Sequence, residues 1–110
     1  MPKPKKTPGT AIKRGVPPAH PGEVLKEMFI EERGLTITEV AEGIGVRRPN
    51  LSAIINGHNG ISAEMAIKLA EAFGTTPQFW INLQNNYELF YAEEKVDRTK
   101  IRHFIPAKAS

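Results

Sequence analysis

Cysteine is absent from the 110 residues of this chain. Its absence excludes a disulfide framework and a thiolate zinc site, and it suits the reducing cytoplasm, where we expect the protein to act. Apolar residues never run unbroken for the roughly 18 positions that a transmembrane helix needs, so we expect no membrane partner. The basic N-terminus is not followed by an apolar segment, so we do not expect a secretory signal.

Catalytic patterns are also absent. The sequence contains no Ser-His-Asp or Cys-His arrangement, no glycine-rich phosphate loop and no HExxH motif. Glu23, Glu27 and Glu31 repeat every four residues, which is typical of a solvated helix face rather than a catalytic pair. The three histidines are too dispersed to suggest a metal site: His20, His58 and His103. We therefore expect neither an enzyme nor a bound metal or cofactor.

Positive charge is concentrated at the start of the chain. Residues 1–20 hold five lysines and arginines and no acid, whereas residues 21–110 hold 10 basic against 12 acidic residues, a net charge of −2. The part of the chain that folds is therefore not broadly basic. Any affinity for nucleic acid must come from a local patch together with the terminal segment.

Composition divides the chain into three segments. Residues 1–18 are rich in proline and lysine and cannot bury enough apolar surface to fold, so we expect a flexible basic arm. Such an arm either tracks phosphates or is merely a solubilising leader or an expression remnant. Residues 19–92 show helical spacing throughout and form the expected domain. Residues 93–110 are basic again and irregular, and we expect a C-terminal tail there.

Capping residues and apolar spacing predict five helices between these segments. The first covers about 21–33, with Val24, Leu25, Met28 and Phe29 facing inward and its glutamates pointing away from any DNA. The second follows a capping box formed by Thr36 and Glu39. The third covers about 48–56, the fourth follows the N-cap residue Ser62 and closes at Gly74, and the fifth begins after Thr76. The expected fold class is therefore all-α.

The stretch between the second and third helices reads GIGVRRPN. Gly45 offers the positive φ that a tight turn between helices needs, and Val46 is expected to anchor the turn in the core. Pro49 lies in the first turn of the third helix, where its missing N–H costs nothing. A short helix, a glycine turn and a helix that begins with arginine predict a helix-turn-helix domain.

Outward residues of the third helix suit contact with DNA. Arg48 can donate to a guanine edge, Arg47 and Asn50 can bind phosphates, and the small Ser52 and Ala53 let the backbone approach the groove. The alternative for the arginine pair is a solvated helix end. Further candidates for DNA contact have equally simple structural roles as helix caps or turn residues: Thr36, Thr38, Asn56 and His58.

The fifth helix is apolar over too wide an arc to face one core. Between Pro77 and Tyr91 its only charged residue is Glu88. Such a helix at the end of a small domain needs a second surface to cover it, and we expect a second copy of the chain. The expected dimer interface consists of Phe79, Trp80, Leu83, Tyr87, Phe90 and Tyr91.

The chain resembles the HigA-type antitoxins, a branch of the Cro/phage-repressor (XRE) helix-turn-helix class. The resemblance covers about residues 19–92 and is carried by HPGEVLKEMF, by ITEVAEGIGV and by LSAIINGHNGISAEMAIKLAEAFGTTPQFWINLQ. The T-x-P-x-F-W-x-N-L-Q pattern is its most specific part. The resemblance implies a lambda-repressor-like fold in a homodimer that binds operator DNA, represses its own operon and neutralises a HigB-type ribonuclease toxin.

Three positions depart from the pattern of this class. Ile37 stands where many members place a glutamine that contacts phosphate, so Thr36, Thr38 or the helix N-terminus would substitute. Arg47 stands where Ser or Thr often caps the third helix, which trades about 1 kcal/mol of capping for a cation. Pro49 cannot read a base by hydrogen bonding, so specificity would rest on Arg48, Ser52, thymine methyl contacts and DNA shape.

Two alternatives to an antitoxin are compatible with the sequence. One is a free-standing transcriptional repressor without a toxin. The other is a protein-binding module that has lost DNA binding, which the acidic charge of residues 21–110 would suit.

Overall fold

The computed structural model describes residues 16–105, and the predictions for residues 1–15 and 106–110 lie outside this part. Within the described residues the fold is all-α without a strand, as predicted. The first helix consists of α1 (Pro21–Val24) and a π-helical continuation, η1 (Leu25–Glu31). It is followed by α2 (Ile37–Ile44), α3 (Arg48–Ile55), α4 (Ala63–Phe73), α5 (Pro77–Lys95) and a short 3-10 turn, η2 (Arg98–Lys100).

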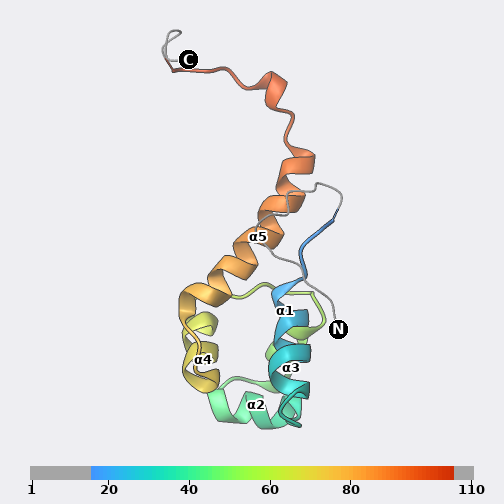
Figure 1. Cartoon of the computed structure of the whole chain (residues 1–110), viewed down its shortest axis with the longest axis vertical. Helices are drawn as coiled ribbons and strands as arrows, with labels where there is room; N and C mark the ends of the chain where they lie inside the picture. The colour runs from blue at the N-terminus through green and yellow to red at the C-terminus, as the bar shows by residue number, and fades with distance from the viewer. Residues whose placement is uncertain (1–15, 106–110) are drawn as a thin grey trace.

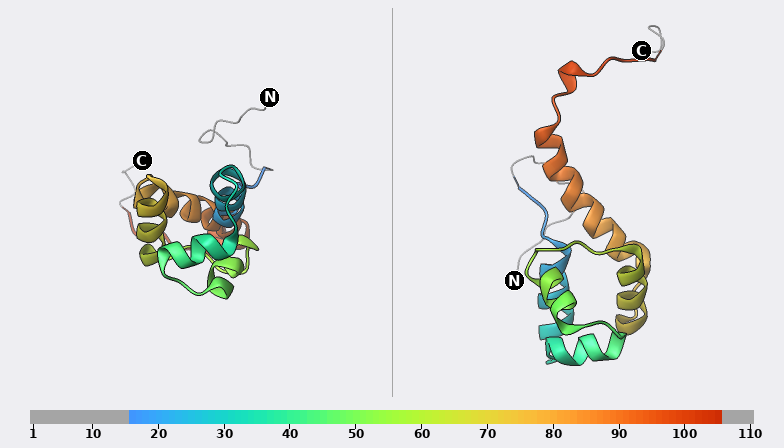
Figure 2. Two further views of the ribbon diagram at one scale, coloured as in Figure 1. Left: turned by 90° about the horizontal axis from the view of Figure 1, so that it is seen from below. Right: turned by 180° about the vertical axis from the view of Figure 1, so that it is seen from behind.

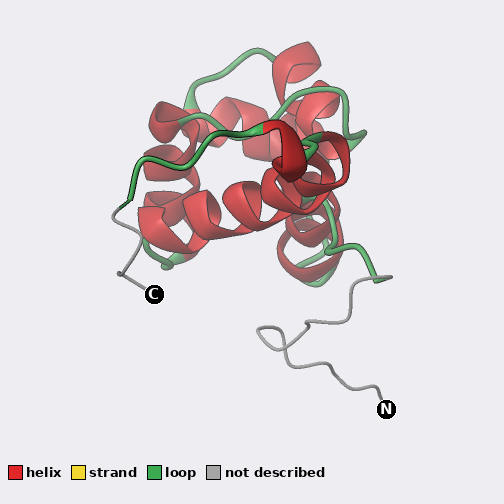
Figure 3. Ribbon diagram, turned by 90° about the horizontal axis from the view of Figure 1, so that it is seen from above, coloured by secondary structure: helices red, strands yellow, loops and turns green. Residues whose placement is uncertain are grey.

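The helices form a body with one long projection. In Figure 1, α1 lies in front of α3 on the right, α2 crosses the lower end, and α4 lies on the left, joined to the start of α5. The views from below and behind show the same arrangement (Figure 2). The last turns of α5 and residues 96–105 extend away from this body (Figure 1), and the view from above shows helices joined by loops (Figure 3).

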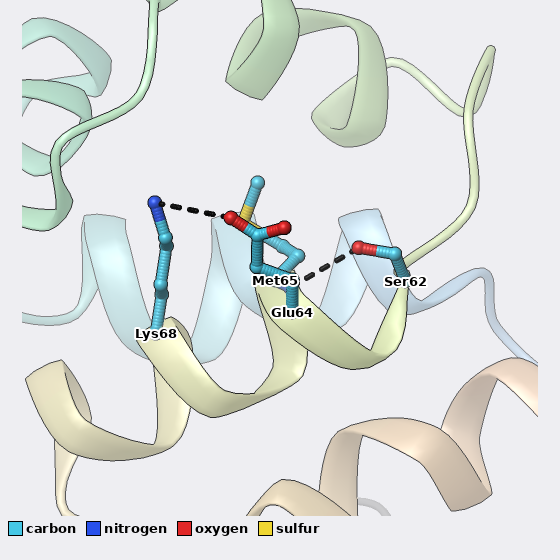
Figure 4. Close-up of polar contacts among 4 residues, drawn as sticks. All are labelled: Ser62, Glu64, Met65 and Lys68. Carbon is cyan, nitrogen blue, oxygen red and sulfur yellow. Dashed lines mark hydrogen bonds and ion pairs between the residues drawn. The ribbon is translucent and has the colours of Figure 1, made fainter.

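The predicted helix signals are confirmed by the local geometry. Thr36 Oγ1 accepts from the Glu39 backbone N–H at 3.0 Å, and the Glu39 carboxylate accepts from the Thr36 backbone N–H at 2.8 Å, which completes the capping box. Ser62 Oγ caps α4 by accepting from the Met65 N–H at 3.1 Å, one turn before an ion pair between Lys68 and Glu64 (Figure 4). Caps of this kind depend only on neighbouring residues, so the sequence predicts them well.

The inner face of the first helix differs from the prediction. Leu25 and Ile30 are buried and Val24 and Phe29 are half-buried, whereas Met28 is 61% exposed. Each inward pair is separated by five residues, because η1 is a π-helix with i→i+5 hydrogen bonds. The wider turn rotates position 28 away from the core, so the prediction of an inward Met28 is wrong.

Trp80 lies at the centre of the core with none of its surface exposed. Its ring packs against Phe29 and Phe79 with centroid separations of 5.1 and 5.0 Å, and its indole N–H donates to Thr75 Oγ1 at 2.7 Å. Its side chain is therefore not available to a second protein, which contradicts the prediction that Trp80 contributes to a dimer interface. The wide apolar arc of α5 is partly explained by this burial within one chain.

The end of α5 also differs from the expectation. The helix continues to Lys95, three residues beyond the predicted end of the helical domain. Beyond it, Asp97 Oδ1 accepts from the Thr99 N–H at 3.1 Å and caps the 3-10 turn η2. The segment from 96 to 105 is otherwise irregular and carries exposed apolar side chains, namely Val96, Ile101, Phe104 and Ile105.

The start of α1 packs directly against the end of α3. A β-carbon added at Gly22 would lie 1.8 Å from the carbonyl oxygen of Ile54, so only glycine fits there. His20 caps α1 by accepting from the Gly22 N–H through Nδ1 at 2.9 Å. Burial lowers the pKa of His20, with the nearby Glu23 charge opposing the shift, which favours the neutral ring that this cap requires.

We predict that Gly22→Ala destabilises the fold. The added methyl group forces α1 away from α3, and overpacking of this kind typically costs about 1–3 kcal/mol in the free energy of unfolding, measured by urea denaturation. Gly43→Ala is the matched control, because no atom lies within 4 Å of the added carbon. The control should be neutral or slightly stabilising. Equal stability of the two variants would contradict the close packing of α1 on α3.

Candidate nucleic-acid interface

The turn between α2 and α3 has the geometry of a helix-turn-helix. Gly45 has a φ of 76°, and the Val46 N–H donates to the Ala41 carbonyl at 3.0 Å, which closes the end of α2. On α3, Leu51, Ile54 and Ile55 are buried, as predicted. These three contacts fix α3 on the core, with its opposite face toward solvent.

The predicted recognition residues lie together on this outer face. Arg47, Arg48 and Asn50 are exposed at the start of α3, and Pro49 is exposed between them. Ser52 and Ala53 follow one turn later and are half-buried. The face therefore combines cations at its N-terminal end with small residues along its middle, an arrangement that lets a helix lie close to a groove of DNA.

The two arginines stand out among the cations of the body. Between residues 21 and 92 there are five basic residues against nine glutamates. Lys26 pairs with Glu31 at 3.7 Å, Lys68 pairs with Glu64 at 3.8 Å, and the Arg33 guanidinium lies 5.2 Å from the centroid of the Phe29 ring. Arg47 and Arg48 have neither an acidic nor an aromatic partner among residues 16–105. Their charge is therefore available to an anion.

Arg48 is oriented by a contact that the sequence did not predict. Its Nε donates to Thr38 Oγ1 at 3.1 Å, across the turn between the two helices. This bond uses one nitrogen of the guanidinium and leaves the two terminal nitrogens as a fork, the part that recognises a guanine edge or a phosphate. The ten-residue separation follows no helical period, so no sequence pattern indicates it.

Thr36 has a different environment from Thr38. Its hydroxyl accepts from the Glu39 N–H and lies 3.3 Å from the Glu39 carboxylate, so the capping box occupies it. Arg47 is the N-cap of α3 and its side chain makes no capping hydrogen bond, in agreement with the sequence. The first turn of α3 therefore has no side-chain acceptor. Pro49 has no N–H and the Asn50 N–H donates to the Arg47 carbonyl at 3.0 Å, so the backbone N–H of Arg48 is the group left for an anion.

The C-terminal end of α3 lies in more acidic surroundings. The Asn56 amide donates to Ser52 Oγ at 3.3 Å, and Asn56 lines a shallow hollow together with Glu23, Glu27 and Lys26 of the first helix, the lysine being paired with Glu31. His58 follows in an exposed turn. Nearby carboxylates disfavour phosphate at this end, so the electrostatics favour the arginine end as the main anion contact. DNA contacts by Asn56 and His58 stay predictions.

The residues predicted for the dimer interface differ in how far they are exposed to solvent. Phe79 and Tyr91 are 36% and 38% exposed, Leu83, Tyr87 and Phe90 are half-buried, and Trp80 is in the core. Leu89, which the sequence pattern did not single out, is 58% exposed.

Among the described residues no helix is long and apolar enough to cross a membrane, and no group of three potential metal ligands comes together.

We predict that Thr38→Val frees the Arg48 side chain without unfolding the domain. The substitution is nearly isosteric but removes the acceptor of the Arg48 Nε–H, an exposed bond that contributes about 0.5–1.5 kcal/mol. The Nε–H resonance of Arg48 in nuclear magnetic resonance spectra should show fast motion in Thr38→Val. It should stay ordered in Thr38→Ser, the matched control that keeps the hydroxyl. Equal mobility in both variants would contradict an orienting role for Thr38.

The geometry agrees with what comparisons with known proteins show. Residues 25–80 match the helix-turn-helix family model. The antitoxin HigA-1 of Vibrio cholerae is 45% identical over 73 residues, which covers 66% of this chain and 69% of that protein.

Two solved structures from Pseudomonas aeruginosa share the fold. One protein, in complex with its 18-base-pair operator DNA, has a TM-score of 0.75 and 35% identity and covers 82% of this chain and 100% of that one. The antitoxin HigA with the higBA promoter has a TM-score of 0.71 and 37% identity, with coverage of 83% and 98%. This chain therefore belongs to the XRE-type helix-turn-helix family of non-enzymatic DNA-binding regulators, in the branch that contains the HigA antitoxins.

Proposed function

We propose that this protein is a sequence-specific DNA-binding antitoxin of a type II toxin-antitoxin pair in the cytoplasm, which represses its own operon and neutralises a HigB-type ribonuclease toxin. The observation that carries the DNA part is the pair Arg47 and Arg48. These residues are the concentrated unpaired positive charge on a body that is otherwise acidic. The family relationship supports the antitoxin part.

In the proposed complex α3 enters the major groove with its arginine end leading. Arg48, held by Thr38, donates to a guanine edge, while Arg47 and Asn50 bind the phosphate backbone. Ser52 and Ala53 are small enough to allow the approach. The N-terminus of α2, which carries Thr36 and Thr38, faces a neighbouring phosphate. Since Pro49 has no donor, the remaining specificity comes from thymine methyl contacts and DNA shape.

The same proposal includes a homodimer formed through α5. Its exposed or half-buried apolar side chains are Phe79, Leu83, Tyr87, Leu89, Phe90 and Tyr91. The later turns of α5 project beyond the body (Figure 1), and the exposed part of these side chains is the surface offered to a second copy. A two-fold dimer presents its two recognition helices about one DNA turn apart, roughly 34 Å. The operator is then a near-palindrome with two half-sites.

We predict that Arg47→Ala with Arg48→Ala lowers operator affinity by at least about 30-fold at 0.1 M salt, because a base contact and a phosphate contact are lost together. The slope of log affinity against log salt should fall by about 1 to 2. Fluorescence anisotropy with DNA from upstream of the operon, ahead of the toxin gene, measures both quantities.

Lys26→Ala with Lys68→Ala is the matched control, because it removes the same charge from lysines that are already paired with glutamates. It should change affinity less than threefold. Equal losses of operator affinity in the two double variants would mean that the arginines act only through their general charge and make no specific contact. Footprinting that shows a monomer on a single asymmetric half-site would contradict the dimer.

The toxin part of the proposal draws on charge. The first helix presents four exposed glutamates, namely Glu23, Glu27, Glu31 and Glu32. They suit a basic partner and are unsuited to phosphate. In the family that the chain resembles, the toxin gene precedes the antitoxin gene. A small basic protein of about 90–110 residues encoded just upstream is therefore the expected partner.

We predict that this upstream product, co-expressed with the antitoxin, copurifies with it and loses ribonuclease activity. Glu27→Lys with Glu31→Lys should weaken the complex by at least about tenfold, because attraction across the contact becomes repulsion. Glu64→Lys with Glu71→Lys, on α4, is the charge-matched control. If no such gene exists, or if its product does not copurify, a free-standing repressor is the better account. Retained toxin binding without operator binding would instead favour a pure protein-binding module.

A further inference from the structure

Gln84 of α5 is the buried polar side chain of the described residues, with 8% of its surface exposed. Its Oε1 accepts from the Ile61 backbone N–H at 2.7 Å, and its Nε2 donates to the Glu88 carboxylate at 2.7 Å. Gly60 lies so close that an added β-carbon would come within 2.6 Å of Gln84 Nε2. The amide therefore fastens residues 60 and 61 to α5 in one fixed position.

Residues 60 and 61 continue the turn that ends the recognition helix. The N–H groups of His58 and Asn59 both donate to the carbonyl of Ala53, at 2.8 and 3.2 Å, so the turn is fixed to α3. Ile61 itself is buried in the core. An almost continuous series of hydrogen bonds thus leads from Ala53, on the outer side of α3, to Gln84 on α5.

A second connection reaches α5 through the first helix. Gly22 packs on the carbonyl of Ile54 at the end of α3, and the ring of His20 meets Tyr87 edge-on with a centroid separation of 4.8 Å. Tyr87 lies on α5 one turn after Gln84. The end of α3 is therefore held to α5 on two sides, once by packing and once by directional hydrogen bonds.

We propose that Gln84 is a positioning residue that sets the distance between the two half-sites which the dimer recognises. This inference rests on the proposed function, in which α5 forms the two-fold interface and α3 reads DNA. In such a dimer any displacement of α3 relative to α5 occurs in both copies, so it changes the separation of the recognition helices twice. One base pair of DNA corresponds to about 3.4 Å along the axis and to a rotation of about one tenth of a turn.

The chemistry of an amide suits this role better than an apolar side chain. Apolar burial is non-directional, whereas a hydrogen bond holds only within a narrow range of distance and angle. The position needs an acceptor for the Ile61 N–H and a partner for Glu88, and glutamine supplies both. The buried N–H of Ile61 would otherwise have no partner.

The test uses the full-length protein and three kinds of duplex: a single half-site, the natural operator, and operators with one base pair inserted or deleted between the half-sites. Wild type should lose at least about tenfold in affinity when the spacing changes, since docking of dimers depends on half-site separation. Gln84→Leu should bind the single half-site within about twofold of wild type. It should bind the natural operator about tenfold more weakly, with a spacing penalty of about threefold or less.

Two further variants separate positioning from general damage. The double exchange Gln84→Glu with Glu88→Gln keeps an acceptor for the Ile61 N–H and reverses the second hydrogen bond at unchanged net charge. It should restore the spacing penalty of wild type. Gly60→Ala displaces the Gln84 amide from the loop side and should flatten the spacing profile as Gln84→Leu does. If Gln84→Leu does not fold, Gly60→Ala decides the question, with circular dichroism to confirm folding of each variant.

The possible outcomes distinguish this inference from the proposed function. If wild type discriminates spacing and the folded Gln84→Leu or Gly60→Ala variant discriminates equally, the role of Gln84 is overturned and the dimeric repressor stands. An exchanged pair that folds but keeps a flattened profile also overturns it. If wild type shows no preference for two spaced half-sites, the proposed dimeric function fails, and the inference fails with it.

Discussion

The burial of Leu51, Ile54 and Ile55 is the constraint on which the rest of the structure depends. An eight-residue helix is not stable in water by itself, so α3 exists because its inner face is covered. The first helix packs so closely on the end of α3 that only glycine fits at position 22. The core around Trp80 lies beneath the first helix and α3. Each of these apolar side chains contributes about 1.5–3 kcal/mol by burial. The exposed residues at the start of α3 are therefore not needed to hold the helix on the core.

Charge is also unevenly distributed over the surface, with the arginine pair at the start of α3 and glutamates over most of the body. The body is acidic, which keeps it from binding polyanions indiscriminately, and its lysines are mostly neutralised by glutamates. Arg47 and Arg48 lie where two helix N-termini meet, so dipole and side-chain charge add there. The positive charge therefore lies on one side of the body, and the exposed glutamates of the first helix repel a phosphate that approaches from the other side.

Local features could be predicted from the sequence because each depends on residues within one turn. The capping box of Thr36, the glycine turn at Gly45 and the caps of α4 and α5 are of this kind. The prediction for Met28 is wrong because the helical period of about 3.6 does not hold in a π-helix. The prediction for Trp80 is wrong because amphipathicity counts apolar residues without saying which are covered within the chain.

Contacts between different helices could not be predicted from sequence patterns. The hydrogen bond from Arg48 to Thr38 depends on how two helices meet across a turn, and the bond from Ile61 to Gln84 joins positions 23 residues apart. Neither follows a helical period, and the residue types involved are common ones without a distinctive signature. The arginine pair could be selected as a site, but the residue that orients it could not.

The missing cap of α3 has a thermodynamic consequence. Since Arg47 supplies no acceptor to the first turn, the free protein lacks about 1 kcal/mol that a serine or threonine would contribute at that end. In the proposed complex an oxygen of the DNA backbone takes the place of the cap, so occupancy by DNA and stability of the helix become linked quantities. Operator binding should then raise the melting temperature of the domain, and heat that frays the first turn of α3 should weaken operator binding before the core unfolds.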